Sequence, residues 1–112
     1  MDIADHSENY PYHFVPMDAM QALDNKLEWL EHTTGGRFDA FHASPPCQAY
    51  TTMNNRHASS SPPLISETRE LLRATGRPWV IENVTGALRE MNATITLTGA
   101  MFGLDLHRPR LF

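Results

Sequence analysis

The sequence contains one cysteine, Cys47, and one lysine, Lys26, in 112 residues. A single cysteine excludes an internal disulfide and a zinc site built from several cysteines. No apolar run approaches the roughly 20 residues that a membrane-spanning helix needs, and the amino terminus is polar and acidic, unlike a secretion signal. We therefore expect a protein of the reducing cytoplasm that has no membrane partner.

The histidines give no metal signature. Six are present, and none is paired at ligand spacing with Cys47 or with an acid. We interpret them as surface residues or as satisfied core residues, and the sequence predicts no metal site.

Length and charge favour one small domain with no general affinity for nucleic acid. At 112 residues, 41% of them hydrophobic and 20% charged, the chain has room for a single domain, residues 1–112, with a modest core. A formal charge of −4 gives no net attraction to a phosphate backbone, so DNA binding would require a local cationic patch or another polypeptide. Arginine suits bidentate contacts to phosphates and bases, and solvated surface is the alternative for each arginine. The candidates are Arg37, Arg56, Arg69, Arg73, Arg77, Arg108 and Arg110.

The residue pattern predicts strands and helices that alternate along the chain. Apolar residues recur at helical spacing from Met20 to Leu30, and a later helix has to end before Gly76 and Pro78. This alternation is typical of an α/β domain with a mainly parallel sheet and right-handed crossovers. The polar stretch rich in serine and proline at about 48–63 predicts a mobile active-site loop. We expect strands at 13–18, 38–43, 79–83 and 94–97, a strand or hairpin arm at 102–112, and helices at 20–31, 66–76 and 88–90.

Cys47 lies in a proline-stiffened loop that follows the apolar run at 38–43. A second apolar run, at 79–81, leads directly into Glu82. Because ligands bind outside the carboxyl ends of parallel strands, we expect Cys47 and Glu82 to share one sheet edge. The sequence therefore predicts a nucleophile and an acid at this edge.

Three short motifs, each with an expected strand before or around it, resemble those of a known family. They are Pro46–Gln48, Glu82–Val84 and Arg108–Arg110. In this order they resemble three signature motifs of the DNA cytosine-5 methyltransferases. The resemblance implies a Rossmann-like methyltransferase core with flanking helices, S-adenosylmethionine as methyl donor and DNA as partner. It also implies a bacterial or phage-encoded protein, as in restriction-modification.

The resemblance implies a catalytic role for four residues of these motifs. The Cys47 thiolate would add to carbon 6 of cytosine, so that carbon 5 can accept a methyl group. Glu82 would bind the ring nitrogen and the exocyclic amine of the cytosine. Arg108 would contact the target base, Arg110 would support the site, and either charge would favour the thiolate.

Ordinary structural roles remain open for the same motifs. A lone cysteine such as Cys47 is commonly a small buried hydrophobe. Glu82 and Asn83 would otherwise be polar caps at the end of a strand. Arg108 and Arg110 would otherwise protect an exposed edge strand, a position that the intervening proline also fits.

The resemblance further implies contacts with the methyl donor and with DNA. Asp2 would bind the ribose hydroxyls of S-adenosylmethionine, Asp18 its adenine amine, and Pro46 would belong to the same donor site. A lone aspartate after a short strand is otherwise a common turn residue. Gln48 and the loop after it would close over a base flipped out of the duplex. Asn83 would orient the loop or donate a hydrogen bond to the substrate.

Two parts of the family pattern have no counterpart in this sequence. The glycine-rich turn after the family's first strand is missing, and no target-recognition domain follows Phe112. We therefore expect an incomplete sheet, with activity that depends on a missing segment or on a partner. A fragment, one half of a split enzyme and a diverged domain are the three explanations.

The leading functional prediction is methyl transfer to carbon 5 of cytosine in DNA, with help from a complementing polypeptide or a homo-oligomer. The alternative is a non-catalytic methyltransferase-like module that acts by protein association, for example through an exposed sheet edge. Covalent trapping at Cys47 and binding of the methyl donor distinguish the two.

Overall fold

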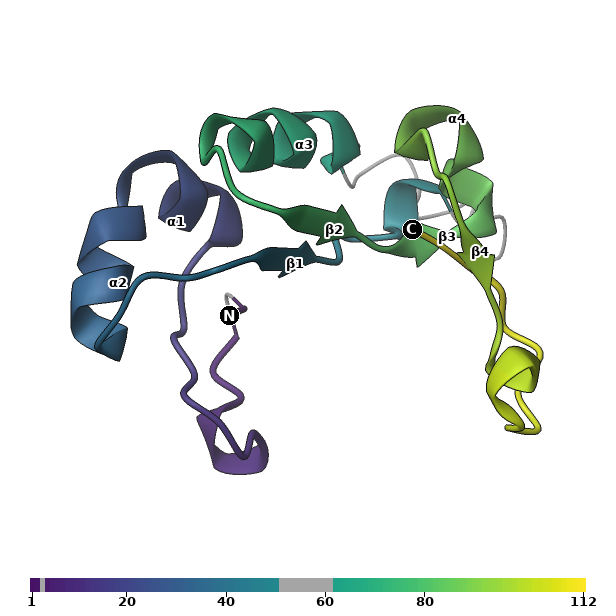
Figure 1. Cartoon of the computed structure of the whole chain (residues 1–112), viewed down its shortest axis with the longest axis horizontal. Coiled ribbons are helices and arrows are strands. Elements are labelled where there is room, and N and C mark those ends of the chain that lie inside the picture. Colours follow the sequence, from purple (N-terminus) through teal and green to yellow (C-terminus); the bar gives the residue numbers. More distant parts are fainter. Residues whose placement is uncertain (3, 51–61) are drawn as a thin grey trace.

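The computed structural model describes residues 1–2, 4–50 and 62–112, which form a mixed α/β architecture (Figure 1). Over these residues, four α-helices accompany two small sheets, so the predicted α/β class is confirmed at this coarse level. None of the described helices is long and apolar enough to cross a membrane. The loop predicted at about 48–63 lies mostly outside the described residues.

Two short helices, α1 (Ala19–Asn25) and α2 (Leu27–Thr34), occupy the region where the apolar spacing predicts one helix at 20–31. The single-helix prediction is wrong at Lys26, whose backbone (φ −120°, ψ 3°) leaves the helical region. Apolar spacing reports which face is buried and carries no information about such a break. The break lets α2 turn away from α1 (Figure 1), and Gly35 (φ 87°) ends α2 in the left-handed conformation.

Asp18 begins a helix and does not end a strand. Its Oδ1 accepts N–H groups of the first turn of α1, including that of Met20 at 2.8 Å, which makes it the N-cap. The strand predicted at 13–18 is therefore wrong. In the described structure this region makes one isolated parallel bridge, between Asp2 and Pro16, and a proline cannot donate a further ladder bond.

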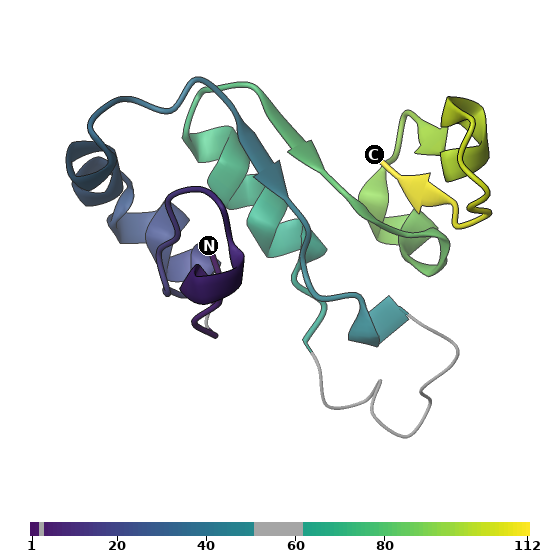
Figure 2. The same cartoon turned by 90° about the horizontal axis from the view of Figure 1, so that it is seen from below.

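The centre of the fold is a parallel strand pair, β1 (Phe41–Ala43) and β2 (Trp79–Ile81), joined through the crossover helix α3 (Ile65–Ala74). Both strands lie inside predicted ranges but are shorter. Helix α3 covers one face of the pair (Figures 1 and 2). Ile65 and Leu72, on α3, are fully buried in the core that also takes in apolar side chains of the two strands.

The other face of the strand pair and one edge of β1 are open. Val80 is 44% exposed, and His42 is exposed beside it. Phe41 and Ala43 direct their backbone hydrogen bonds toward the β2 segment, so parallel geometry directs the N–H and C=O of His42 toward the opposite edge. Among the described strands, β1 pairs with β2 alone, which leaves this edge available to another strand.

A second sheet is antiparallel and consists of β3 (Asn83–Val84), β4 (Thr96–Leu97) and β5 (Arg110–Leu111) in the order β3-β5-β4. The prediction of a mainly parallel sheet is therefore wrong for the described strands. The strand predicted at 102–112 is reduced to two residues. The edge position considered for it is also wrong, because β5 lies in the middle of its sheet.

The tight reversal between β4 and β5 explains why these two neighbours run antiparallel. Helix α4 (Leu88–Met91) ends at Asn92 (φ 50°), and η5 (Gly99–Phe102) ends at Gly103 (φ 75°). Short reversals join antiparallel strands, whereas parallel strands need a long crossover such as α3. The predicted helical turn and the strand predicted at 94–97 are confirmed as α4 and β4.

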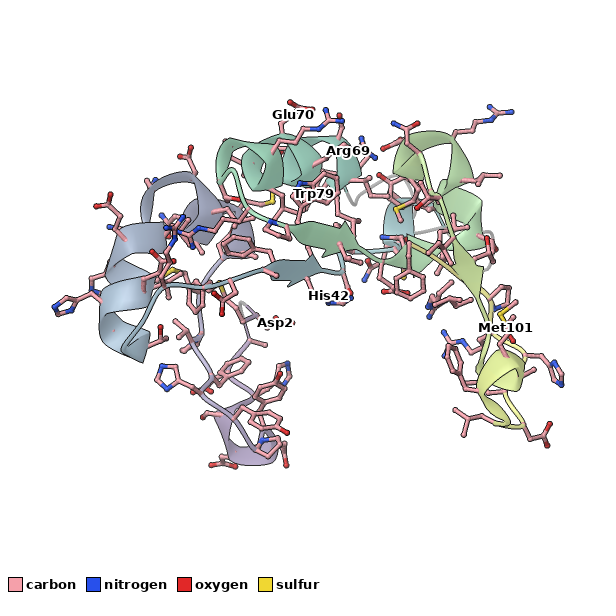
Figure 3. All side chains as sticks on the ribbon, in the orientation of Figure 1. Asp2, His42, Arg69, Glu70, Trp79 and Met101 are labelled. Atoms are coloured by element: carbon pink, nitrogen blue, oxygen red, sulfur yellow. The ribbon has the colours of Figure 1, made fainter. Side chains whose placement is uncertain are left out.

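The molecule is open for its length. Its radius of gyration is 15.4 Å, whereas a compact domain of about 100 residues has about 13 Å. Large apolar side chains are exposed, and the tip that carries Met101 (63% exposed) and Phe102 (67%) projects away from the core (Figure 3). A small core with exposed apolar surface is typical of a chain that binds a partner or a ligand.

Candidate functional site

A cleft of about 740 Å³ runs beside β1, within the usual size range of ligand sites. It is lined by α1, α2 and α3, by β1 and the loop after it, and by the start of β3. Apart from Arg108, every site residue predicted from the sequence lines this cleft. The structure thus brings together residues from the amino-terminal region, the Cys47 loop and the β3–β5 sheet.

Cys47 occupies a turn that leads from β1 into the short helix η2 (Gln48–Tyr50). The buried Pro45 and the exposed Pro46 precede it, and the Tyr50 N–H donates to the Cys47 carbonyl at 2.9 Å. Cys47 itself is half-buried, unpaired and part of the cleft wall. A thiol at such a wall is placed to act as a nucleophile toward a molecule in the cleft.

Glu82 and Arg110 form an ion pair at the same cleft. Arg110 Nε lies 2.6 Å from Glu82 Oε1, and the two side chains are 30% and 21% exposed. Glu82 sits between β2 and β3, and Arg110 begins β5, where it is paired in register with Val84. The sheet therefore holds the carboxylate beside a fixed positive charge, an arrangement that can orient the carboxylate toward a polar ligand.

Asn83 is buried (2% exposed), and its amide is engaged within the protein. Its Nδ2 donates to the Pro45 carbonyl at 2.8 Å, and its Oδ1 accepts the Val84 N–H at 2.9 Å. These contacts tie the start of β3 to the loop that carries Cys47. The structure therefore shows a hydrogen bond between Asn83 and the Cys47 loop. A contact between Asn83 and substrate stays a prediction.

Arg108 does not accompany Arg110 into the cleft. It is exposed, precedes β5, and is absent from the cleft lining. A spacing of two places both arginines on one face only if both belong to the same strand, and the strand begins at Arg110. The predicted contact between Arg108 and a target base stays a prediction.

Asp2 and Asp18 line the cleft together and offer carboxylates to a ligand. The hydrogen bonds described for them use Oδ1: that of Asp2 accepts the Ala4 N–H at 3.1 Å, and that of Asp18 caps α1. Oδ2 of each has no hydrogen bond within the described structure. The hydroxyls and the amine of an adenosine group are donors, so two free carboxylate oxygens fit that part of S-adenosylmethionine.

Pro46 and Gln48 flank Cys47 and are both exposed at the cleft. Their contacts with donor and DNA stay predictions. In the described parts of the chain, no three side chains of histidine, cysteine, aspartate or glutamate gather as metal ligands would.

Three residues next to the site do not stand out in the sequence. Around the turn after Cys47, the Tyr50 hydroxyl donates to Glu90 and the Tyr50 backbone lies against Gly86. Gly86 is recognisable as a turn residue after a strand. The partner of Tyr50 lies 40 residues away along the chain, a separation at which no local pattern reports a contact.

Comparison with known proteins gave no match among family models, curated proteins or solved structures. The three motifs and the geometry of the cleft are therefore the observations that bear on function.

Proposed function

We propose that this chain carries the catalytic site of a DNA cytosine-5 methyltransferase and that its fold is part of a Rossmann-like methyltransferase core. One observation supports this most strongly: Cys47, Glu82 and Arg110 come from three separate segments and line one cleft. A nucleophile, a carboxylate and a guanidinium are the groups that addition to a cytosine ring requires.

The proposed reaction starts with the Cys47 thiolate. Its electron pair forms a bond to carbon 6 of a flipped-out cytosine, and the electrons of the C5–C6 double bond become available at carbon 5. Carbon 5 then bonds to the methyl group of S-adenosylmethionine, the methyl–sulfur bond breaks, and S-adenosylhomocysteine leaves with the electrons of that bond. Water then removes the proton from carbon 5, and the electrons of that C5–H bond re-form the C5–C6 double bond. The C6–S bond breaks at the same time, and its electrons return to sulfur as the thiolate.

Glu82 and Arg110 have distinct roles in this proposal. The Glu82 carboxyl shares its proton with the ring nitrogen and accepts a hydrogen bond from the exocyclic amine, and so draws electrons from the ring when the thiolate adds. Arg110 orients that carboxyl through the 2.6 Å ion pair. Asp2 and Asp18 bind the adenosine part of the methyl donor through their free oxygens.

The proposal includes a partner polypeptide. A net charge of −4 does not attract DNA, and the open edge of β1 lies along the cleft. A partner that supplies positive charge and a strand for this edge would complete both the DNA surface and the sheet. A homo-oligomer is the other form this partner can take.

Transfer of a labelled methyl group from S-adenosylmethionine to DNA tests the proposal. The chain is assayed alone and with a polypeptide that carries a glycine-rich first strand. We expect incorporation that disappears in Cys47→Ser and falls strongly in Glu82→Gln. Ala49→Ser, which introduces the same hydroxyl two residues away, should retain activity. Equal incorporation by Cys47→Ser and the unmodified chain would contradict the proposal.

A second candidate is a non-catalytic module that acts by association, and the exposed apolar tip around Phe102 favours it. It predicts a stable complex or oligomer with no heat of S-adenosylmethionine binding in calorimetry. Donor binding by the chain that is lost in Asp2→Asn and Asp18→Asn would exclude this candidate.

A further inference from the structure

The turn that carries Cys47 is fastened at its far end by Tyr50. The Tyr50 N–H closes the turn on the Cys47 carbonyl at 2.9 Å. The Tyr50 hydroxyl donates to Glu90 Oε2 on α4 at 2.8 Å. Burial and the Glu90 hydrogen bond raise the pKa of Tyr50 to about 12, so its hydroxyl stays a neutral donor across the physiological range.

Gly86 allows this fastening because it lies against the backbone of Tyr50. A Cβ at Gly86 would stand 2.0 Å from the Tyr50 carbonyl oxygen and 3.2 Å from the carbonyl carbon. No side-chain rotation relieves such a contact, since both atoms belong to the backbone. Any residue larger than glycine must therefore push the end of η2 away from the segment that leads into α4.

Hydrogen bonds from α3 fix the position of the Glu90 backbone. The Arg69 guanidinium is buried (8% exposed) and donates to the carbonyl oxygens of Glu90 and, at 3.0 Å, of Met91. In Figure 3 Arg69 projects from α3 toward α4. A series of hydrogen bonds thus connects α3 to the Cys47 turn, through Arg69, Glu90 and Tyr50.

We propose that Tyr50, Gly86 and Glu90 are positioning residues that hold Cys47 at the wall of the cleft. Their importance for catalysis rests on the proposed function, but their effect on the Cys47 thiol does not. The three residues act together with the bond from Asn83 to Pro45, which fastens the other end of the same turn.

Loss of this fastening increases the population of turns in which the thiol is open to solvent. One hydrogen bond contributes about 0.5–1.5 kcal/mol, which corresponds to a change of roughly 2- to 10-fold in an opening equilibrium. Because Cys47 is the single cysteine, its rate of alkylation by iodoacetamide reports a change in the exposure of its thiol.

The test compares alkylation rates of Cys47 in matched variants, with folding checked by circular dichroism. Tyr50→Phe, Glu90→Ala and Gly86→Ala should each raise the rate roughly 2- to 10-fold. Tyr12→Phe, at a 78% exposed tyrosine, and Gly36→Ala, where nothing lies within 4 Å of the added carbon, should not. Glu90→Gln keeps an acceptor for Tyr50 and should stay near the unmodified rate.

A distant destabilising variant separates local positioning from general loss of stability. Trp79→Ala truncates a side chain that packs against the core at the end of β2 opposite to the Cys47 loop, outside the cleft lining, and should leave the alkylation rate unchanged where the protein remains folded. Rates in Tyr50→Phe and Gly86→Ala equal to those of their controls would overturn the inference. Altered rates without any methyl transfer by the unmodified chain would instead count against the proposed function and leave the positioning role intact.

Discussion

Asn83 is the most deeply buried polar side chain of the site, with 2% of its surface exposed. Its amide donates to the carbonyl of Pro45, which is a buried residue. A buried polar group left without a partner costs more than the hydrogen bond contributes. At the scale of the residue, the Pro45 end of the Cys47 loop is therefore held by a single amide.

Asn83→Ala tests this dependence. We expect the free energy of unfolding to fall by about 1–3 kcal/mol, because the Pro45 carbonyl loses its donor. Urea unfolding at neutral pH provides the measurement. Asn25→Ala is the matched control, since Asn25 is exposed and its side chain bonds to the neighbouring Asp24. Equal stabilities for the two variants would show that the amide is dispensable.

Site residues could be predicted from the sequence where they belong to a short local motif. Cys47, Glu82 and Asn83 each follow an apolar run, and the structure brings all three to one cleft. Arg108 shows the limit of this reasoning: its place depends on where β5 begins, which a spacing of two does not determine. The role of Tyr50 could not be predicted, because its hydroxyl bonds to a residue 40 positions away along the chain.

At the scale of the element, α2 is joined to the entry of β2 by one ion pair. Arg77 donates to the Glu31 carboxylate, with Nη2 3.3 Å from Oε2, and Nη1 also donates to the Phe38 carbonyl at 3.0 Å. Glu31 Oε1 in turn accepts the Phe38 N–H at 2.8 Å. These bonds fix the chain between α2 and β1, and so fix one side of the cleft.

The Glu31–Arg77 pair predicts a dependence of stability on acid. The hydrogen bonds from Arg77 and from the Phe38 N–H lower the pKa of Glu31 below its ordinary 4.5. A lowered pKa in the folded state contributes stability above the unfolded pKa, and that stability is lost as pH falls through the folded value. Glu31→Gln should therefore be less stable than the unmodified protein at neutral pH, with a difference that shrinks in acid.

Thermal unfolding across this pH range measures the effect. Glu28→Gln, on the exposed side of the same helix, is the control and should show no such pH-dependent difference. If the difference in melting temperature between Glu31→Gln and the unmodified protein stayed constant as the pH fell, the proposed contribution of the Glu31 carboxylate would be contradicted.

Helix α3 packs its buried face against the strand pair. Leu72 is 1% exposed within the core cluster, whereas Leu88 on α4 is 60% exposed. Leu72→Ala should lower the free energy of unfolding by about 2–5 kcal/mol, because it removes buried apolar surface and leaves a cavity. Leu88→Ala should change it by less than about 0.5 kcal/mol. Denaturant titration of the two variants checks this contrast.

Helices and strands were predicted correctly where apolar residues repeat at one regular spacing. Their boundaries and pairing were predicted wrongly where these depend on contacts between distant parts of the chain. One strand is predicted at 79–83, but the structure has two, β2 and β3, which belong to different sheets and lie on either side of Glu82. The break at Lys26 is invisible to helical spacing for the same reason. The antiparallel return of β5 depends on the reversal at Gly103, which the pattern alone does not assign.

At the scale of the whole molecule, a small core stands beside a large open cleft. The radius of gyration of 15.4 Å and the exposed apolar side chains indicate surface that a ligand or partner would cover. A molecule that binds the folded chain at this cleft should raise its melting temperature as its concentration increases. The cleft is thus the feature through which fold and proposed chemistry are linked.

Intact-mass analysis of the chain, after incubation with S-adenosylmethionine and DNA that contains 5-fluorocytosine, tests the assignment of Cys47 most directly. Fluorine at carbon 5 cannot leave as a proton does, so the enzyme stays bonded to the DNA. We predict a methylated covalent adduct at Cys47, formed with the complementing polypeptide where the chain alone is inactive, and no adduct with Cys47→Ser. Absence of the adduct under both conditions, or its persistence in Cys47→Ser, would contradict the assignment.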